Sequence, residues 1–354
     1  MALLLCNGCG LSSGMPEGSQ FIPADSALAL SFNLPALTAT DLYKELQQQG
    51  GAVGLNRLNF MQFAKAAGLD PVRDVKWLTF LGRGAAEEGL QVDQLSALVS
   101  GSFDGGKVYS FMKESGLPFE THAGLDIFQV LIVDDRCRLC IAILDDHTAA
   151  FGDGETLRGM GEARQNPSSA LASDETAARL LTRLDSRAAI WGIARGRRLA
   201  GSLAGFLQQM AAQSKEAAAF TSIEDIAFFV AAGENILLAA DAVARSEEDA
   251  MLIADILEGA GAMGRLALKQ ARQQEAGKFL TSFKVQVDGL VVRASTSFPQ
   301  SALVELAQGA MSDLFRMPAM PFGLGGMPGM GGATPDPADD DPPATEDGDG
   351  GSDE

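Results

Sequence analysis

The same order of strand-like and helix-like segments occurs twice along this chain of 354 residues. In each half a strand is followed by a helix, a hairpin, a second helix, a second hairpin and a closing helix. Both halves therefore follow the plan β-α-β-β-α-β-β-α, which predicts an internal duplication. Because the strands alternate apolar and polar residues, we expect an α+β fold with antiparallel sheets and helices on one face.

The individual elements follow from local pattern. Ser246 precedes three acidic residues, which is typical of a helix start. Asp288-Gly289 separates two alternating runs, which predicts a type I′ turn. The predicted strands are 27–34, 75–81, 95–100, 127–133, 138–144, 188–194, 226–231, 236–240, 283–287 and 290–294. The predicted helices are 37–48, 60–67, 108–114, 155–162, 174–184, 199–213, one that begins at Ser246, and 301–315.

Composition sets the domain organisation. With 46% apolar and 21% charged residues, the chain is long enough to bury a full core. After residue 315 it becomes rich in Met, Gly and Pro and then acidic, which predicts a disordered tail. We expect a signal remnant or tether at 1–20, repeats at 21–165 and 166–315, and the tail at 316–354.

The charge of the chain limits its partners. The net charge is −19, and nine acidic residues without a basic one lie in 335–354, which leaves −10 for the residues before them. Nucleic acid is an unsuitable partner because phosphate binding needs a basic surface. Anionic lipid would also repel the chain, so any membrane attachment should come from an anchor. No apolar run approaches the roughly 18 residues of a membrane span.

All four cysteines lie in C-x-x-C pairs, Cys6/Cys9 and Cys137/Cys140. Two such pairs are typical of a four-thiolate zinc site. However, Cys137 and Cys140 fall in a predicted strand, where residues three apart point to opposite faces. We therefore expect no metal site and interpret the second pair as small strand residues.

The amino-terminal segment suggests a lipid anchor. A short apolar run, Gly8-Cys9-Gly10 and a Ser/Gly/Pro stretch precede the first strand, as at the end of a bacterial lipoprotein signal. A complete signal has a basic start and an apolar stretch of about 7–15 residues, both missing here, and a start codon placed too far downstream would explain this. We expect lipid attachment at Cys9, with a cytoplasmic chain as the alternative.

One motif favours an enzyme. Gly101, Gly106 and Lys107 fit G-x-x-x-x-G-K between an apolar strand and a helix, the context of a nucleotide-binding P-loop. Asp145 follows a second apolar strand, where such proteins hold magnesium. Against this, Val108 replaces the magnesium-binding hydroxyl residue, and a hairpin separates the two motifs. The matching stretch of the second half, 239–246, has no glycine or lysine.

Other chemistry is sparse. The two histidines, His122 and His147, both lie beside predicted turns, and Asp145-Asp146-His147 is interpreted as a polar turn. No G-x-S-x-G motif lies between a predicted strand and a predicted helix, the context of a catalytic serine. Arg195 and its neighbours 197–198 are interpreted as a solvated face. We expect no cofactor and no catalytic set.

Two sequence segments carry a resemblance to known proteins. They are FIPADSALALSFNLPAL, which begins at Phe21, and AAIWGIARGRRLA, which begins at Ala188. They resemble a group of uncharacterised exported proteins and lipoproteins of Gram-negative bacteria, whose mature domain opens with Ile-Pro-Ala-Asp. The resemblance covers about Phe21 to Phe298. It implies export and no known catalytic residue.

Together these observations predict a non-enzymatic binding or scaffolding protein of the cell envelope, in the periplasm or at the outer membrane, with a lipid anchor at Cys9. Its partner is an unidentified protein or hydrophobic ligand. One alternative is a P-loop-like NTPase that uses Gly101, Gly106, Lys107 and Asp145. Another is a carrier that holds a lipid or other apolar ligand between sheet and helices.

Overall fold

The computed structural model describes residues 18–40, 43, 70–85, 89–133, 136–185, 188–196, 219–270 and 280–300. All of them belong to one compact unit that ends at Gln308. The second unit, Gly309–Glu354, lies outside the described residues, and so do Cys9, the predicted tail and the predicted helices at 60–67, 199–213 and 301–315.

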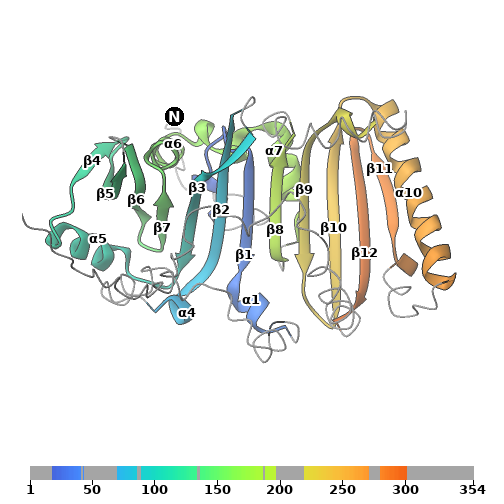
Figure 1. Ribbon diagram of the computed structural model, residues 1–354, viewed down its shortest axis with the longest axis horizontal. Coiled ribbons are helices and arrows are strands. Elements are labelled where there is room, and N and C mark those ends of the chain that lie inside the picture. The colour runs from blue at the N-terminus through green and yellow to red at the C-terminus, as the bar shows by residue number, and fades with distance from the viewer. Residues whose placement is uncertain are drawn as a thin grey trace, which may run out of the picture. The chain divides into compact units, whose positions relative to one another are not determined.

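The strands form a single twelve-stranded sheet in which every pair is antiparallel (Figure 1). Its order is β11-β12-β10-β9-β8-β1-β2-β3-β7-β6-β5-β4. The α+β prediction is confirmed, with one sheet for both halves. The strands are β1 (Leu28–Asn33), β2 (Val75–Ala85), β3 (Gly89–Gly101), β4 (Phe119–His122), β5 (Leu125–Val133), β6 (Arg136–Asp145), β7 (Thr148–Gly152), β8 (Ala188–Arg195), β9 (Ile223–Ala231), β10 (Asn235–Ala244), β11 (Lys284–Asp288) and β12 (Val291–Pro299).

The two halves meet where β1 pairs with β8, with Leu28 opposite Ala194 and Phe32 opposite Ile190. Outward from this pair, β2 and β3 follow on one side and β9 and β10 on the other. The first strand of each half therefore lies in the middle of the sheet, and the later hairpins lie toward its edges.

The predicted unit is wrong for the first half. Four strands, β4 to β7, follow its second helix, whereas two were expected. The two that were missed are short: three of the four residues of Phe119–His122 are polar, and Thr148–Gly152 ends on a glycine. Such segments carry too little alternation to be recognised before their neighbours are known.

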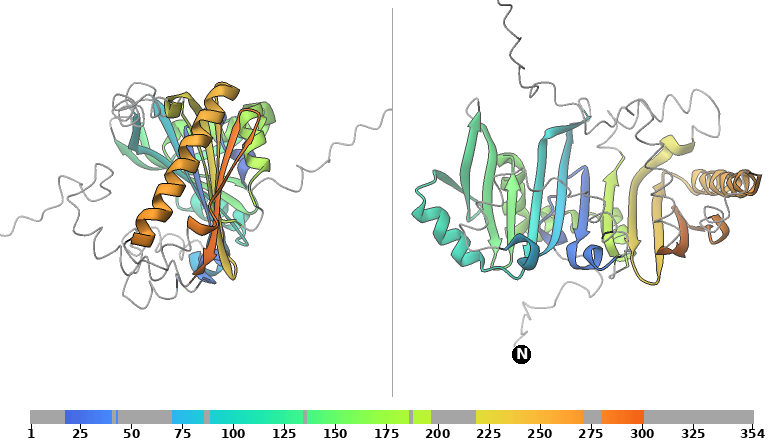
Figure 2. Two further views of the ribbon diagram at one scale, coloured as in Figure 1. Left: turned by 90° about the vertical axis from the view of Figure 1, so that its right-hand side faces the viewer. Right: turned by 60° about the horizontal axis from the view of Figure 1, so that its bottom comes forward.

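Helices cover both faces of the sheet, so the expectation of helices on one face is wrong. Face I carries Leu98, Leu144 and Trp191, and packs against α6 and α7. Face II carries Val99 and Ile141, which pack against α5, and Val292, which packs against α10. The left panel of Figure 2 views the sheet from its β11 end, with α10 on one side. The helices are α1 (Leu34–Thr38), α4 (Pro71–Asp74), α5 (Gly105–Glu114), α6 (Gly154–Gln165), α7 (Glu175–Thr182) and α10 (Glu247–Gln270).

The uninterrupted apolar runs within the strands explain why helices cover both faces of the sheet. Within β6, Ile141 faces α5, whereas Ala142 and Leu144 face α6. Successive strand residues point to opposite faces, so an uninterrupted run such as Ile-Ala-Ile-Leu is typical of a strand covered on both sides.

A continuous row of side chains crosses the middle of face I. Thr79 of β2, Ser31 of β1, Trp191 of β8 and Phe229 of β9 are paired in register. The Ser31 and Thr79 hydroxyls are buried and lie 2.7 Å apart in a hydrogen bond. Trp191 is 1% exposed and belongs to the same hydrophobic cluster as Leu81 and Leu98 of the first half. The two halves therefore share one core.

Two local predictions have different outcomes. The Ser246 cap is confirmed, because its hydroxyl accepts a 3.0 Å hydrogen bond from the Asp249 backbone nitrogen at the start of α10. The type I′ turn at Asp288-Gly289 is wrong, because Gly289 has a φ of 59° and Asp288 remains in β11. Gly289 and Leu290 form the two-residue loop, and a glycine in its first position is typical of type II′.

Candidate functional site

The glycine motif lies beside the Asp145–His147 turn, as the nucleotide hypothesis requires, but its amides are occupied. The Gly101 nitrogen donates to the His147 carbonyl at 2.9 Å, and the Gly105 nitrogen donates to the Asp146 carbonyl at 2.8 Å. Asp104 caps α5 and accepts from the Lys107 nitrogen at 3.0 Å. A P-loop needs such amides free for phosphate oxygens.

Packing accounts for two of the glycines in this motif. A Cβ atom on Gly101 would lie 1.9 Å from the Asp74 carbonyl oxygen, and one on Gly105 would lie 2.6 Å from the Asp145 carbonyl oxygen. The Lys107 ammonium lies 3.4 Å from Asp104 and faces solvent. β3 is antiparallel to both β2 and β7, whereas a P-loop strand belongs to a parallel sheet. The motif therefore functions here as a close strand-to-helix connection.

Asp145 is engaged within its own turn. Its Oδ1 accepts from the His147 backbone nitrogen at 2.8 Å, which confirms the predicted polar turn. The His147 Nδ1 lies 3.2 Å from the Phe103 carbonyl oxygen. These contacts fix the turn against the glycine motif.

Arg195, expected in a solvated face, is instead half-buried where the two halves meet. Its side chain is 14% exposed, and its Nη2 lies 2.8 Å from Asp174 at the start of α7. Its Nε lies 3.4 Å from Asp225 at the start of β9, and its Nη1 donates to the Ala24 carbonyl at 3.3 Å. One guanidinium thus connects the segment before β1, the helix between the halves and the second half.

The two carboxylates around Arg195 differ in their pKa. Burial raises the pKa of Asp225 above its usual value, although Arg195 acts in the opposite direction. The pKa of Asp174 is lowered: burial opposes this, but hydrogen bonds from the Ala177 nitrogen and Arg195 outweigh it. Removal of the arginine would leave Asp225, whose side chain is 5% exposed, without its charge partner.

A second buried ion pair lies on face I between β10 and β12. Arg293 donates to both oxygens of Asp241, at 2.8 and 2.6 Å, and also to the Arg183 carbonyl at the end of α7. The bidentate geometry satisfies a carboxylate that is almost completely buried. Both buried pairs connect the second half to α7, and their donors are directed at protein oxygens and not at an open site.

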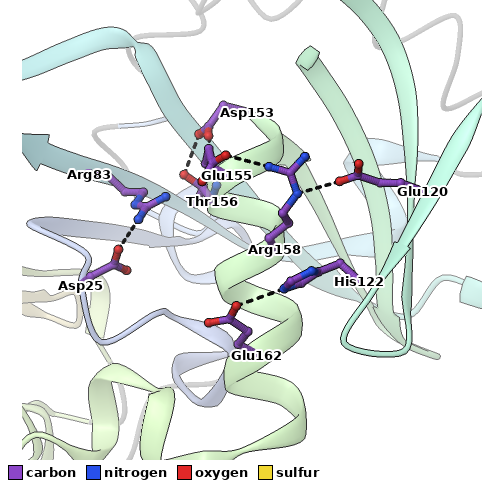
Figure 3. A network of polar contacts seen from close by, with 9 residues as sticks. All are labelled: Asp25, Arg83, Glu120, His122, Asp153, Glu155, Thr156, Arg158 and Glu162. Atoms are coloured by element: carbon purple, nitrogen blue, oxygen red, sulfur yellow. Dashed lines mark hydrogen bonds and ion pairs between the residues drawn. The ribbon is translucent and has the colours of Figure 1, made fainter. Parts of the chain in front are cut away.

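Figure 3 shows a third polar group, around α6. Arg158 donates to Glu120 of β4 and to Glu155, both at 2.7 Å, and its hydrogen bond to Glu120 is the main reason that its pKa is raised. His122 Nε2 lies 3.0 Å from Glu162 Oε1. These pairs attach the edge strand β4 to α6.

The fourth polar group joins α5 to β4 and β5. Asp126 accepts from Thr121 at 2.6 Å and from Tyr109 at 2.7 Å, and Lys113 lies 3.0 Å away. These hydrogen bonds, led by that of Thr121, lower the pKa of Asp126 to about 2. The Lys113 ammonium also lies 3.3 Å from the centre of the Phe119 ring, a favourable cation–π contact.

Among the cysteines, Cys140 is buried on face I and forms a disulfide. Its partner lies outside the part of the chain whose side chains are described, which leaves Cys6, Cys9 and Cys137. Within the described residues, no three His, Cys, Asp or Glu side chains gather closely enough to hold a metal ion. No helix of the described chain is long and apolar enough to cross a membrane.

Exposed apolar side chains gather in two places. Val130, Leu131 and Leu139 lie on β5 and β6, and Met251, Leu252, Met263 and Leu266 lie on α10. Sequence reasoning missed both, although the apolar positions of α10 could have been found by plotting its residues at 100° intervals. Contiguous apolar surface of this kind is typical of binding sites.

The comparisons with known proteins assign no family. No protein-family model matches the chain, and no curated protein and no solved structure is significantly similar to it.

Arg195→Met tests the connection at the junction. We expect a loss of about 3–5 kcal/mol in the free energy of unfolding at pH 7, because Asp225 would remain buried and unpaired. Arg179→Met, which removes an exposed ion pair with Glu175, is the matched control and should change it by less than about 0.5 kcal/mol. Equal effects in chemical denaturation would contradict the structural role of Arg195.

Asp126→Asn tests the charged form of this carboxyl group. The pKa of Asp126 is lowered to about 2 in the folded chain. Its ionised form therefore stabilises the fold above the pKa of the same group in the unfolded chain, which is about 3.9. At any pH between 5 and 7, the free energy of unfolding of the variant should be about 1–2 kcal/mol lower than that of the unchanged chain. That difference should shrink as the pH falls from about 4 through 2, in urea unfolding curves. A difference that persists at pH 2 would show that the ionised carboxylate is not what stabilises the fold.

Proposed function

We propose that this chain is an exported, non-enzymatic binding or scaffolding protein of the cell envelope, anchored to the membrane by a lipid on Cys9. The observation that carries the proposal of export is the disulfide of Cys140. Protein disulfides persist in oxidising compartments such as the bacterial periplasm and are rare in the cytosol, where thiols are kept reduced.

The polar groups support a binding role over catalysis. In the four groups described above, the main charged side chains contact partners of opposite charge or backbone groups of the same chain. An active site needs groups directed at a substrate, often with a charge left unbalanced for it. The exposed apolar side chains of α10 and of β5–β6 are better suited to contact with another surface.

We also propose that the two halves arose by duplication. From the β1–β8 pair, each half continues through a second and a third strand, and a helix follows the third: α5 after β3 and α10 after β10. Both helices pack on face II. A hairpin then returns a strand to the side of the third strand, β7 in one half and β12 in the other. On this proposal, β4 and β5 are an insertion in the first half.

Of the two alternatives, the carrier of a hydrophobic ligand is closer to this proposal, because binding such a ligand also uses apolar surface. The NTPase is disfavoured by the paired amides of Gly101 and Gly105. A purified chain that hydrolyses ATP or GTP, and loses this activity in Lys107→Ala, would overturn the non-enzymatic proposal.

The test is the chemical state of the cysteines in protein isolated from its own cells, by membrane fractionation and peptide mass spectrometry without reduction. We expect a membrane-bound chain that begins at a diacylglyceryl-modified Cys9. Cleavage before Cys9 removes Cys6, so Cys137 is then the one cysteine left in the chain to pair with Cys140. A peptide that joins Cys9 to Cys140 would exclude the anchor, because one sulfur cannot carry both bonds. A free Cys140 thiol would contradict export.

A further inference from the structure

An apolar stripe runs along the outer surface of α10. The helix packs on face II through Ala250, Ile253 and Ala254, which are buried. Its opposite side exposes Met251, Leu252, Met263 and Leu266, with exposed fractions between 39% and 74%. At 100° per residue, these four side chains share one side of the helix and span about 22 Å of its length. We call them the α10 stripe.

The stripe lies on both sides of Gly259, and Leu252 and Leu266 are equally distant from it. Met251 and Leu252 precede this glycine by eight and seven residues, and Met263 and Leu266 follow it by four and seven. A Cβ atom on Gly259 would meet nothing within 4 Å, so no packing inside the chain requires a glycine there. A glycine in mid-helix costs about 1 kcal/mol relative to alanine, and it permits the close approach of a second helix.

We propose that the α10 stripe is the contact surface between two copies of this chain, with the two α10 helices antiparallel and crossing at Gly259. An antiparallel arrangement places Leu252 of one copy opposite Leu266 of the other, with Met251 one residue away. The same patch thus serves both copies, as a twofold dimer requires. This proposal does not depend on export or on the lipid anchor.

Charge complementarity favours a second copy as the occupant. The first turn of α10 is acidic, with Glu247, Glu248 and Asp249. The last turn of α10 contains Lys269, and an antiparallel partner brings that turn beside the acidic one, with the two helix dipoles opposed. Asp255 and Arg265, both exposed, lie four residues before and six residues after Gly259. The crossing therefore brings the Arg265 of one copy close to the Asp255 of the other.

The same charges disfavour a lipid surface as the occupant. Helices that lie on membranes carry lysine and arginine beside their apolar face, whereas Glu248, Asp255 and Glu258 lie on or beside this one. Anionic headgroups would be repelled.

The size of the stripe predicts a weak dimer. A helix face of about 22 Å by about 10 Å buries less surface than the roughly 1,200 Å² at the lower limit of stable interfaces. We therefore expect a dissociation constant on the order of 10–100 μM.

Sedimentation equilibrium of the full chain between about 1 and 500 μM is the direct measurement. We expect a reversible monomer–dimer equilibrium, with Leu266→Glu weakening it at least about tenfold. Leu131→Glu, on β5 and similarly exposed at 52% against 58%, is the matched control and should leave it unchanged. A monomer at all concentrations, or equal loss in both variants, would overturn the proposal.

Four further variants distinguish the proposed helix crossing from nonspecific association through exposed apolar side chains. Gly259→Leu should raise the thermal midpoint, because leucine favours a helix, and yet should weaken the dimer about tenfold or more. Asp255→Arg and Arg265→Asp should each weaken the dimer, and the double variant should restore it. If the double variant is the weakest, or if the chain instead binds phospholipid vesicles through Leu266, the antiparallel dimer is wrong.

Discussion

The antiparallel pairing of β1 with β8 is the interaction on which the rest of this structure depends. These two strands, about 160 residues apart in the sequence, make one sheet out of two halves. They also place Trp191 beside Ser31 and Thr79, so that one hydrophobic cluster extends through both halves. Arg195, at the end of β8, then attaches the helix between the halves to this junction.

The sequence predicts those parts of the fold that depend on neighbouring residues. The start of α10 at Ser246, the strands that alternate clearly and the turn at Asp145–His147 all follow from local pattern. The sequence does not predict which strands pair in the middle of the sheet. Backbone hydrogen bonds between strands form in the same way whatever the side chains are. The same limit explains why helices were expected on one face: the run through Ile141 and Leu144 was interpreted as part of a one-sided strand.

The candidate site shows a similar division. The glycine motif has the spacing of a phosphate-binding loop, yet the spacing does not reveal that the amides of Gly101 and Gly105 bind the neighbouring turn. Arg195 was interpreted as solvated because its neighbours in sequence are charged, whereas its two carboxylate partners come from distant segments. The exposed side of α10 is the one functional candidate that helical periodicity could have revealed.

The shared core is tested most directly by unfolding the chain with one reporter in each half. The chain has two tryptophans, Trp77 on β2 and Trp191 on β8. Trp77→Phe and Trp191→Phe each leave one fluorescent reporter, whose denaturation curve is compared with the loss of circular dichroism in the same variant. A single cooperative unit predicts that fluorescence and dichroism coincide in both variants. A tryptophan signal that changes at a denaturant concentration different from that of the dichroism, in either variant, would show that the halves unfold as separate domains and would contradict the account.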